Sequence, residues 1–259
     1  ISARHGAMAK AAEVLREAAE AASAPQPRAD ILLEVAKIHE GSADATRAEG
    51  IYREVLELDR EDPTVALPAA RSLERIYGAT GRSKELAEMI RVQVKLEVEP
   101  DARRALLGRL GALCEEQLSD LDAAVGAWKE RLEDDPTDDE ALVALDRLYE
   151  RKGDARALVD ILRSRERLAQ GADARKTFMV RAAATLDEKL GDIDEAILAY
   201  RAVLDDFGPE RSILASLARL YERAKRNEDL AETLVAELGL VDVVDVRRTR
   251  AAAPCVVER

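Results

Sequence analysis

The chain has little of the side chains from which most enzyme and metal sites are built. Its 259 residues include two histidines, His5 and His39, and two cysteines, Cys114 and Cys255. No Cys-x-x-Cys, His-Glu-x-x-His or glycine-rich phosphate loop occurs in it. An active site needs a nucleophile, a base or a metal. The sequence therefore predicts a protein that is not an enzyme, with no catalytic residues, no metal site and no cofactor.

Aromatic residues, glycine and proline are also scarce. Five Tyr, two Phe and one Trp make up 3% of the chain, and Gly and Pro number 13 and 8. Strands joined by tight turns need more of these residues, so a strand-and-turn architecture is excluded. No run of 18 apolar residues is present, and membrane insertion is therefore excluded.

Positive charge is in deficit, with 40 basic against 52 acidic side chains and a net charge of −12. A surface that binds nucleic acids in general has to be basic, so we expect no nucleic-acid partner. The acidic run at 133–140 contains Pro136 and lacks the central glycine of a calcium-binding EF-hand loop. We interpret that run as a helix cap and a linker.

The chain is rich in Ala, Leu, Glu, Lys and Arg, a composition typical of long helices and helical repeats. A shift of 72 residues aligns 101–171 with the following stretch without a gap. The matches include Asp101-Ala102-Arg103 with Asp173-Ala174-Arg175, Trp128 with Tyr200, and Arg147-Leu148-Tyr149-Glu150-Arg151 with Arg219-Leu220-Tyr221-Glu222-Arg223. The chain is therefore built from an internal repeat.

The repeat predicts how the chain is divided. The predicted divisions are the last helix of a preceding unit at 5–24, three full units at 28–98, 101–171 and 173–240, and the poorly defined start of another unit at 245–259. We interpret the chain as a piece of a longer array. The first unit is four residues longer in its first half, and we place this insertion in a connection around 58–68.

Each unit contains apolar residues at helical spacing in two halves of about 36 residues. In the second unit, Leu107, Leu110 and Cys114 form one apolar stripe, and Asp120 is the predicted N-cap of the next helix. Each half is therefore predicted to be a helix hairpin. No single hairpin buries its apolar stripe alone, whereas stacked neighbours do.

These motifs resemble the tetratricopeptide repeat (TPR), in long arrays of the bacterial type. The family pattern has Leu-Gly on the first helix of a hairpin, then Ala and an aromatic on the second, and Pro after it. Leu110-Gly111, Ala124, Trp128 and Pro136 fill these slots, whereas Arg131 departs from the small residue expected. The resemblance implies an all-α fold, a right-handed α-α superhelix (TPR-like solenoid) of antiparallel helix pairs in 72-residue double-hairpin units.

The resemblance also bears on the aromatic residues. Six of them stand at repeat positions and are predicted to be core residues: Tyr52, Tyr77, Trp128, Tyr149, Tyr200 and Tyr221. Some family members hold the C-terminal carboxylate of chaperones with Lys and paired Asn residues. Asn227 is the single asparagine of this chain, so we do not expect that role.

The first helices of hairpins line the concave groove in this family, and charged residues recur on them here. Arg75, Arg147 and Arg219 repeat every 72 residues, and Glu150 and Glu222 follow the last two arginines. A row of arginines suits an acidic or extended peptide, so these five are the candidate partner-binding residues. The alternative is that each Arg–Glu pair is a solvated ion pair at i,i+3.

The sequence thus predicts a non-catalytic scaffold for protein–protein interaction, which binds a peptide or protein partner in its concave groove. One alternative is a structural spacer or self-assembling array, with self-association through exposed solenoid ends. Another is an accessory region of a larger multidomain protein whose catalytic part lies elsewhere. We expect a soluble protein of the cytoplasm or periplasm.

Overall fold

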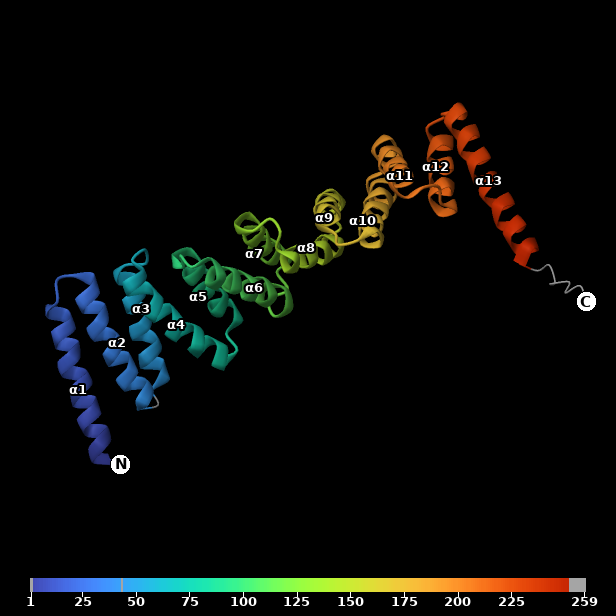
Figure 1. The fold of residues 1–259 in the computed structure, drawn as a ribbon. Coiled ribbons are helices and arrows are strands. Elements are labelled where there is room, and N and C mark those ends of the chain that lie inside the picture. Colours follow the sequence, from blue (N-terminus) through green and yellow to red (C-terminus); the bar gives the residue numbers. More distant parts are fainter. Residues whose placement is uncertain (1, 43, 252–259) are drawn as a thin grey trace, which may run out of the picture. The chain divides into compact units, whose positions relative to one another are not determined.

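Every regular element in the computed structural model, which describes residues 2–42 and 44–251, is a helix (Figure 1). The chain divides into two compact units, residues 1–141 and 142–259. The first unit contains α1 (Ser2–Ala21), α2 (Pro25–Gly41), α3 (Ala45–Leu58), α4 (Pro63–Thr80), α5 (Ser83–Leu96), α6 (Pro100–Glu116) and α7 (Leu121–Asp134). The boundary falls inside α8 (Asp139–Lys152), and the second unit continues with α9 (Ala155–Leu168), α10 (Ala172–Thr185), the π-helix η1 (Leu186–Leu190), α11 (Ile193–Phe207), α12 (Arg211–Arg223) and α13 (Asn227–Ala251).

Within each unit, helices that follow one another in the chain pack together as hairpins. The even-numbered helices from α2 to α12 are the first helices of these hairpins, and the odd-numbered helices from α3 to α13 are the second helices. The predicted all-α fold of helix pairs is confirmed. The 72-residue unit stays a prediction. α13 runs unbroken across position 245, the predicted start of a following unit, and residues 252–259 lie outside the described part.

Aspartate side chains begin several of the second helices. The carboxylate of Asp120 accepts a hydrogen bond from the backbone N–H of Ala123, at 2.9 Å, at the start of α7. Asp154 and Asp192 do the same for α9 and α11. Each carboxylate satisfies a backbone donor that has no partner within the helix. The predicted N-cap at Asp120 is confirmed.

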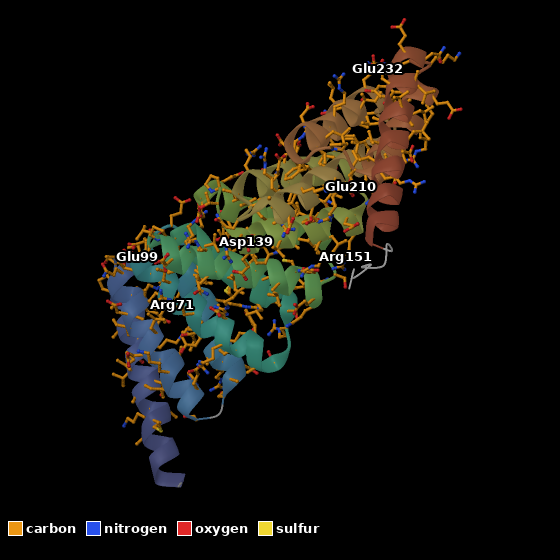
Figure 2. The ribbon with its side chains drawn as sticks, turned by 45° about the vertical axis from the view of Figure 1, so that its right-hand side comes forward. Arg71, Glu99, Asp139, Arg151, Glu210 and Glu232 are labelled. Atoms are coloured by element: carbon orange, nitrogen blue, oxygen red, sulfur yellow. The ribbon has the colours of Figure 1, made fainter. Side chains whose placement is uncertain are left out.

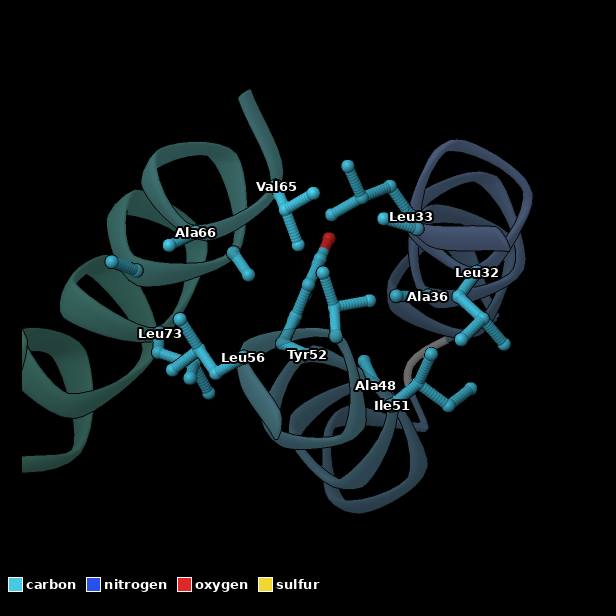
Figure 3. Close-up of a cluster of buried hydrophobic side chains, with 14 of the residues drawn as sticks. Leu32, Leu33, Ala36, Ala48, Ile51, Tyr52, Leu56, Val65, Ala66 and Leu73 are labelled. Carbon is cyan, nitrogen blue, oxygen red and sulfur yellow. The ribbon is translucent and has the colours of Figure 1, made fainter. Parts of the chain in front are cut away.

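The core of the first unit is built around aromatic rings held between helices. Figure 3 shows Tyr52 of α3 with Leu33 of α2 and Val65 of α4 beside its ring, and all three are buried. The six aromatic residues predicted to be core residues are all buried, which confirms that expectation: Tyr52, Tyr77, Trp128, Tyr149, Tyr200 and Tyr221.

The four extra residues of the first predicted repeat, 28–98, lie in a helix and not in a connection. α4 has 18 residues, whereas α8 has 14. The links before these two helices are equally long, at 59–62 and 135–138. Four residues are about one helical turn, so the insertion keeps the buried face of α4 in phase. The predicted insertion in a connection around 58–68 is therefore wrong, and Pro68 lies inside α4.

A close contact between an aromatic ring and a small residue joins α6 to α7. A Cβ atom added to Gly111 would lie 2.6 Å from Cε2 of Trp128, so only glycine fits beneath this ring. Seventy-two residues later the pair is Ala183 and Tyr200, both buried. The larger ring thus stands opposite glycine and the smaller ring opposite alanine. The sizes compensate each other at equivalent positions.

The departure from the family pattern at Arg131 also has a structural reason. Its side chain is buried, and Nε donates to Oδ2 of Asp138 at 2.8 Å while Nη2 donates to Glu140 at 2.6 Å. The guanidinium lies over the ring of Trp128. Asp138 in turn accepts a hydrogen bond from the backbone N–H of Ala141, in the first turn of α8. Arg131 therefore ties α7 to the start of the next helix.

We expect Gly111→Ala to destabilise the protein in the native background and to stabilise it beside Trp128→Tyr. The clash with the indole costs about 1–3 kcal/mol, against which the better helix propensity of alanine returns about 1 kcal/mol. With the smaller ring the clash is relieved and only the propensity gain remains. Urea unfolding of the four members of this double-mutant cycle measures the change of sign. Additive effects would contradict the size compensation.

Arg131→Val is expected to lower the free energy of unfolding by about 3 kcal/mol, because the buried Asp138 carboxylate loses its closest cation and keeps Arg104, whose Nε lies 3.5 Å away. Valine occupies the equivalent position, Val203, in the second unit, so it suits the helix. Thermal or urea unfolding checks the value. The exposed neighbour Lys129, substituted by Ala, is the control and should change stability by less than about 0.5 kcal/mol. An equal effect of the two substitutions would rule out the buried ion pair as a tie.

Candidate partner-binding surface

The predicted arginine row lies on three first helices: Arg75 on α4, Arg147 on α8 and Arg219 on α12. Arg75 forms an ion pair with Glu40 of α2, and Nη2 of Arg219 lies 2.8 Å from Oδ2 of Asp187 in η1. The side chains of Arg75 and Arg219 remain 64% and 55% exposed. Each of these two guanidinium groups thus binds a carboxylate on one edge and remains accessible to solvent on the other.

The two glutamates of the candidate set also lie on first helices. Glu150 of α8 lies 3.6 Å from Arg181 of α10 and 3.6 Å from Lys189 of η1. Glu222 of α12 is exposed. Glu150 and Arg219 thus each pair with a side chain of a neighbouring element, and the alternative of i,i+3 pairs on a solvated face stays open.

A more general rule governs these pairs: an arginine on one first helix reaches a carboxylate on the first helix before it. Arg109 of α6 pairs with Glu74 of α4, and Arg181 of α10 pairs with Asp146 of α8 at 2.8 Å. The two pairs are equivalent by the 72-residue shift. Sequence reasoning missed them, although an acid and an arginine about 35 residues apart, recurring in the next copy, is a signal that the sequence contains.

The carboxylates of these pairs are buried more deeply than the arginines. The side chain of Asp146 is 7% exposed and that of Asp187 is 3% exposed. Asp146 accepts from Arg181 and also from Arg165 of α9, and Asp187 accepts from Arg219 and Arg223. Hydrogen bonding to Asp146 raises the pKa of Arg181. Negative charge is thus neutralised inside, and guanidinium groups form the outer layer of each pair.

The second helices carry a different feature, a cleft between neighbouring second helices that has the same construction in both units. One cleft, of about 560 Å³, lies between α5 and α7 with Leu110 and Arg103 of α6 in its lining. The other, of about 440 Å³, lies between α9 and α11 and is lined by Ala182 and Arg175 of α10. These lining residues are 72 positions apart in the sequence. The two clefts are therefore equivalent in construction.

A carboxylate lies across the cleft of the second unit. Glu195 of α11 accepts hydrogen bonds from Arg156 at 2.6 Å and from Arg163 at 2.8 Å, both on α9. The hydrogen bond from Arg163 and then that from Arg156 lower the pKa of Glu195. The carboxylate is ionised at neutral pH and joins two second helices that otherwise face each other across the cleft.

Charged side chains cover the helices of both units (Figure 2), but those that the structure describes form no metal centre. In residues 7–42 and 44–240, whose side chains the structure describes, no three His, Cys, Asp or Glu side chains lie together as ligands for a metal ion. Cys114 is buried, as predicted, and burial raises the pKa of its thiol, which is therefore protonated at neutral pH. His39 is only partly buried. Among the helices that could be searched, none combines the length and the apolar character needed to span a membrane.

No protein-family model matches the chain, and no curated protein sequence matches it. Solved structures do. A chain of the Naa15/Naa10 complex bound to HypK-THB is 17% identical, with a TM-score of 0.50. The match covers 82% of this chain and 32% of that one. This likeness supports the helical-repeat fold.

Two further structures match over most of their own length. YrrB, described as a TPR protein with an unusual peptide-binding site, is 17% identical with a TM-score of 0.36, and the match covers 72% of this chain and 90% of YrrB. The MamA protein is 14% identical with a TM-score of 0.39, and the match covers 74% of this chain and 98% of MamA. The fold that the structure itself shows is a helical repeat of successive helix hairpins.

Proposed function

We propose that this protein is a non-catalytic scaffold that binds a peptide or protein along the face formed by its first helices. The observation that carries this proposal is the recurring arginine row. Arg75 is fixed by Glu40 of α2 and Arg219 by Asp187 of η1, with the rest of each guanidinium in solvent. A guanidinium that is already fixed loses little conformational entropy when a second carboxylate or a peptide carbonyl binds it.

The chemistry of this face suits an extended or acidic partner segment. Arginines recur at one position of every second hairpin, so a partner that lies across the first helices of residues 142–259 meets two of them, Arg147 and Arg219. Glu150 and Glu222 add acceptors for backbone N–H groups or basic side chains. The Naa15/Naa10 complex bound to HypK-THB is a precedent for a partner held by a protein of this fold.

The test is the double variant Arg147→Gln/Arg219→Gln. Glutamine is used because a glutamate at 219 would face the buried carboxylate of Asp187, which keeps its second partner, Arg223. A partner obtained by crosslinking from the source cells and then purified should bind the double variant about tenfold more weakly or worse, measured by calorimetry.

The matched control is Arg201→Gln, which removes an exposed arginine from the second helix α11 and should leave the Kd unchanged. Circular dichroism establishes that all variants keep their helicity. An unchanged Kd for the double variant with intact helicity would remove the arginine row from the binding site.

One observation favours self-assembly as a second candidate function. Leu234 of α13 is 44% exposed, whereas its counterparts in the 72-residue register, Leu162 and Ile90, are 0% and 2% exposed. Val235 and Leu238 are exposed beside it. Leu162 lies on α9, on which α10 packs, and Ile90 lies on α5, on which α6 packs. On α13 the corresponding apolar face is exposed, and a second copy could cover it.

If copies associate through this face, Leu234→Lys should abolish a concentration-dependent increase in sedimentation coefficient, because a lysine ammonium cannot be buried there without a partner. Ala231→Lys, at an exposed alanine of the same helix, is a control for added charge. A native protein that sediments as a monomer at all concentrations would exclude this candidate.

A further inference from the structure

The two equivalent clefts between second helices differ in what fills them. In the second unit, Glu195 bridges Arg156 and Arg163, and Leu198 follows one turn later on the same helix. Glu195 is also the third residue of α11, and Asp192 is its N-cap. The charge and the volume of this cleft are therefore supplied from within the chain.

In the first unit the cations are kept and both filling side chains are absent. Lys84 and Arg91 of α5 stand at the positions of Arg156 and Arg163, seven residues apart on one helix face. Ala123 stands at the position of Glu195, and Gly126 at that of Leu198. A Cβ atom on Gly126 would meet no atom within 4 Å, so the space is open. The cleft is correspondingly larger, at about 560 Å³ against about 440 Å³.

The other charges at this cleft are already engaged. Arg103 pairs with Glu130 and Asp134, and Lys95 lies 3.3 Å from Glu61. The carboxylate of Asp120 is engaged as the N-cap of α7.

Lys84 and Arg91 differ from these groups. Arg91 contacts the thiol of Cys114. Among the side chains of residues 7–42 and 44–240, neither Lys84 nor Arg91 has an ion-pair partner. Arg91 lines the cleft, and Lys84 precedes it by two helical turns on the same face of α5, whereas the equivalent pair in the second unit, Arg156 and Arg163, is bridged by an anion.

We propose that the cleft between α5 and α7 binds an acidic peptide segment of a partner protein. A glutamate or aspartate of that segment takes the position that the Glu195 carboxylate occupies in the second unit, between Lys84 and Arg91. An apolar side chain of the segment fills the space over Gly126. The walls that it contacts are Val94, Leu110 and Ala127, which are buried apolar side chains of all three helices.

Two features favour a partner peptide over other occupants. Lys84 and Arg91 give this face a local positive charge on a chain whose net charge is −12, and this local charge attracts the carboxylate of an acidic segment at short range. A small carboxylate ion alone does not suit the cleft, because it would leave the apolar wall of Val94, Leu110 and Ala127 exposed to water. This surface shares no residue with the arginine row of the first helices, so the two can be tested separately.

The decisive variant is Ala123→Glu, which places in the first cleft the carboxylate that the second cleft already has. Position 123 is the third residue of a helix whose N-cap is Asp120, as position 195 is in α11, and glutamate is favoured there. The variant should therefore fold at least as stably as the native chain. A loss of binding cannot then be attributed to unfolding.

The probe is a short fluorescein-labelled peptide of glutamate and leucine, measured by fluorescence anisotropy at low salt with the full chain. We expect Ala123→Glu and the double variant Lys84→Ala/Arg91→Ala each to raise its Kd by about tenfold or more. Glu195→Ala/Leu198→Ala, which frees Arg156 and Arg163 and opens the space that Leu198 fills, should add a second binding event. Arg201→Gln should have no effect, and a peptide with lysine in place of glutamate should not bind.

Three results would overturn the proposal. The native chain fails to bind the acidic peptide, or binds the lysine peptide equally well. Ala123→Glu binds the acidic peptide with an unchanged Kd. The native chain self-associates in sedimentation and Ala123→Glu abolishes this, in which case the occupant is a second copy and not a partner peptide.

Discussion

The fold depends on close contact between an aromatic ring on one helix of a hairpin and a small residue on the other. Trp128 lies so close to Gly111 that no Cβ atom fits between them. At the equivalent positions, Tyr200 and Ala183 are both buried in one hydrophobic cluster. Because a single hairpin cannot bury its apolar stripe alone, this contact fixes how closely two helices approach and therefore how the next hairpin can pack.

Ion pairs between successive first helices provide a second, lateral connection. Asp146 and Asp187 are buried among the arginines that they hold, and the outer edges of those arginines face water. Such pairs add little stability where they are exposed, but a buried carboxylate without its partner would be costly. The arrangement therefore specifies the register of neighbouring helices, and it leaves fixed guanidinium groups on the surface as a consequence.

Much of the fold follows from the sequence because it depends on local signals. Aspartate N-caps such as Asp120, apolar stripes at helical spacing and aromatics at repeat positions each act within one hairpin. The partners of Arg75 and Arg219 do not follow, because a recurrence every 72 residues reveals the row and not the carboxylate about 35 residues earlier that each arginine meets. The sequence does not show that the four extra residues lie in α4, for a similar reason. Four residues added to a helix and four added to a loop look alike in an alignment.

Equivalent positions in the copies show which side chains are required for stacking and which are free to serve another purpose. Gly111 and Ala183 vary together with their rings, so the packing requirement is unchanged. Ala123 and Glu195 vary without any compensating change in the cations that face them, and Gly126 and Leu198 vary in the same cleft. Selection for stability alone favours the filled, neutralised version, since that version already exists in the same chain and fits the same helices. An open and cationic copy beside a closed and neutral one is therefore best explained by an occupant that supplies the missing carboxylate and apolar side chain from outside.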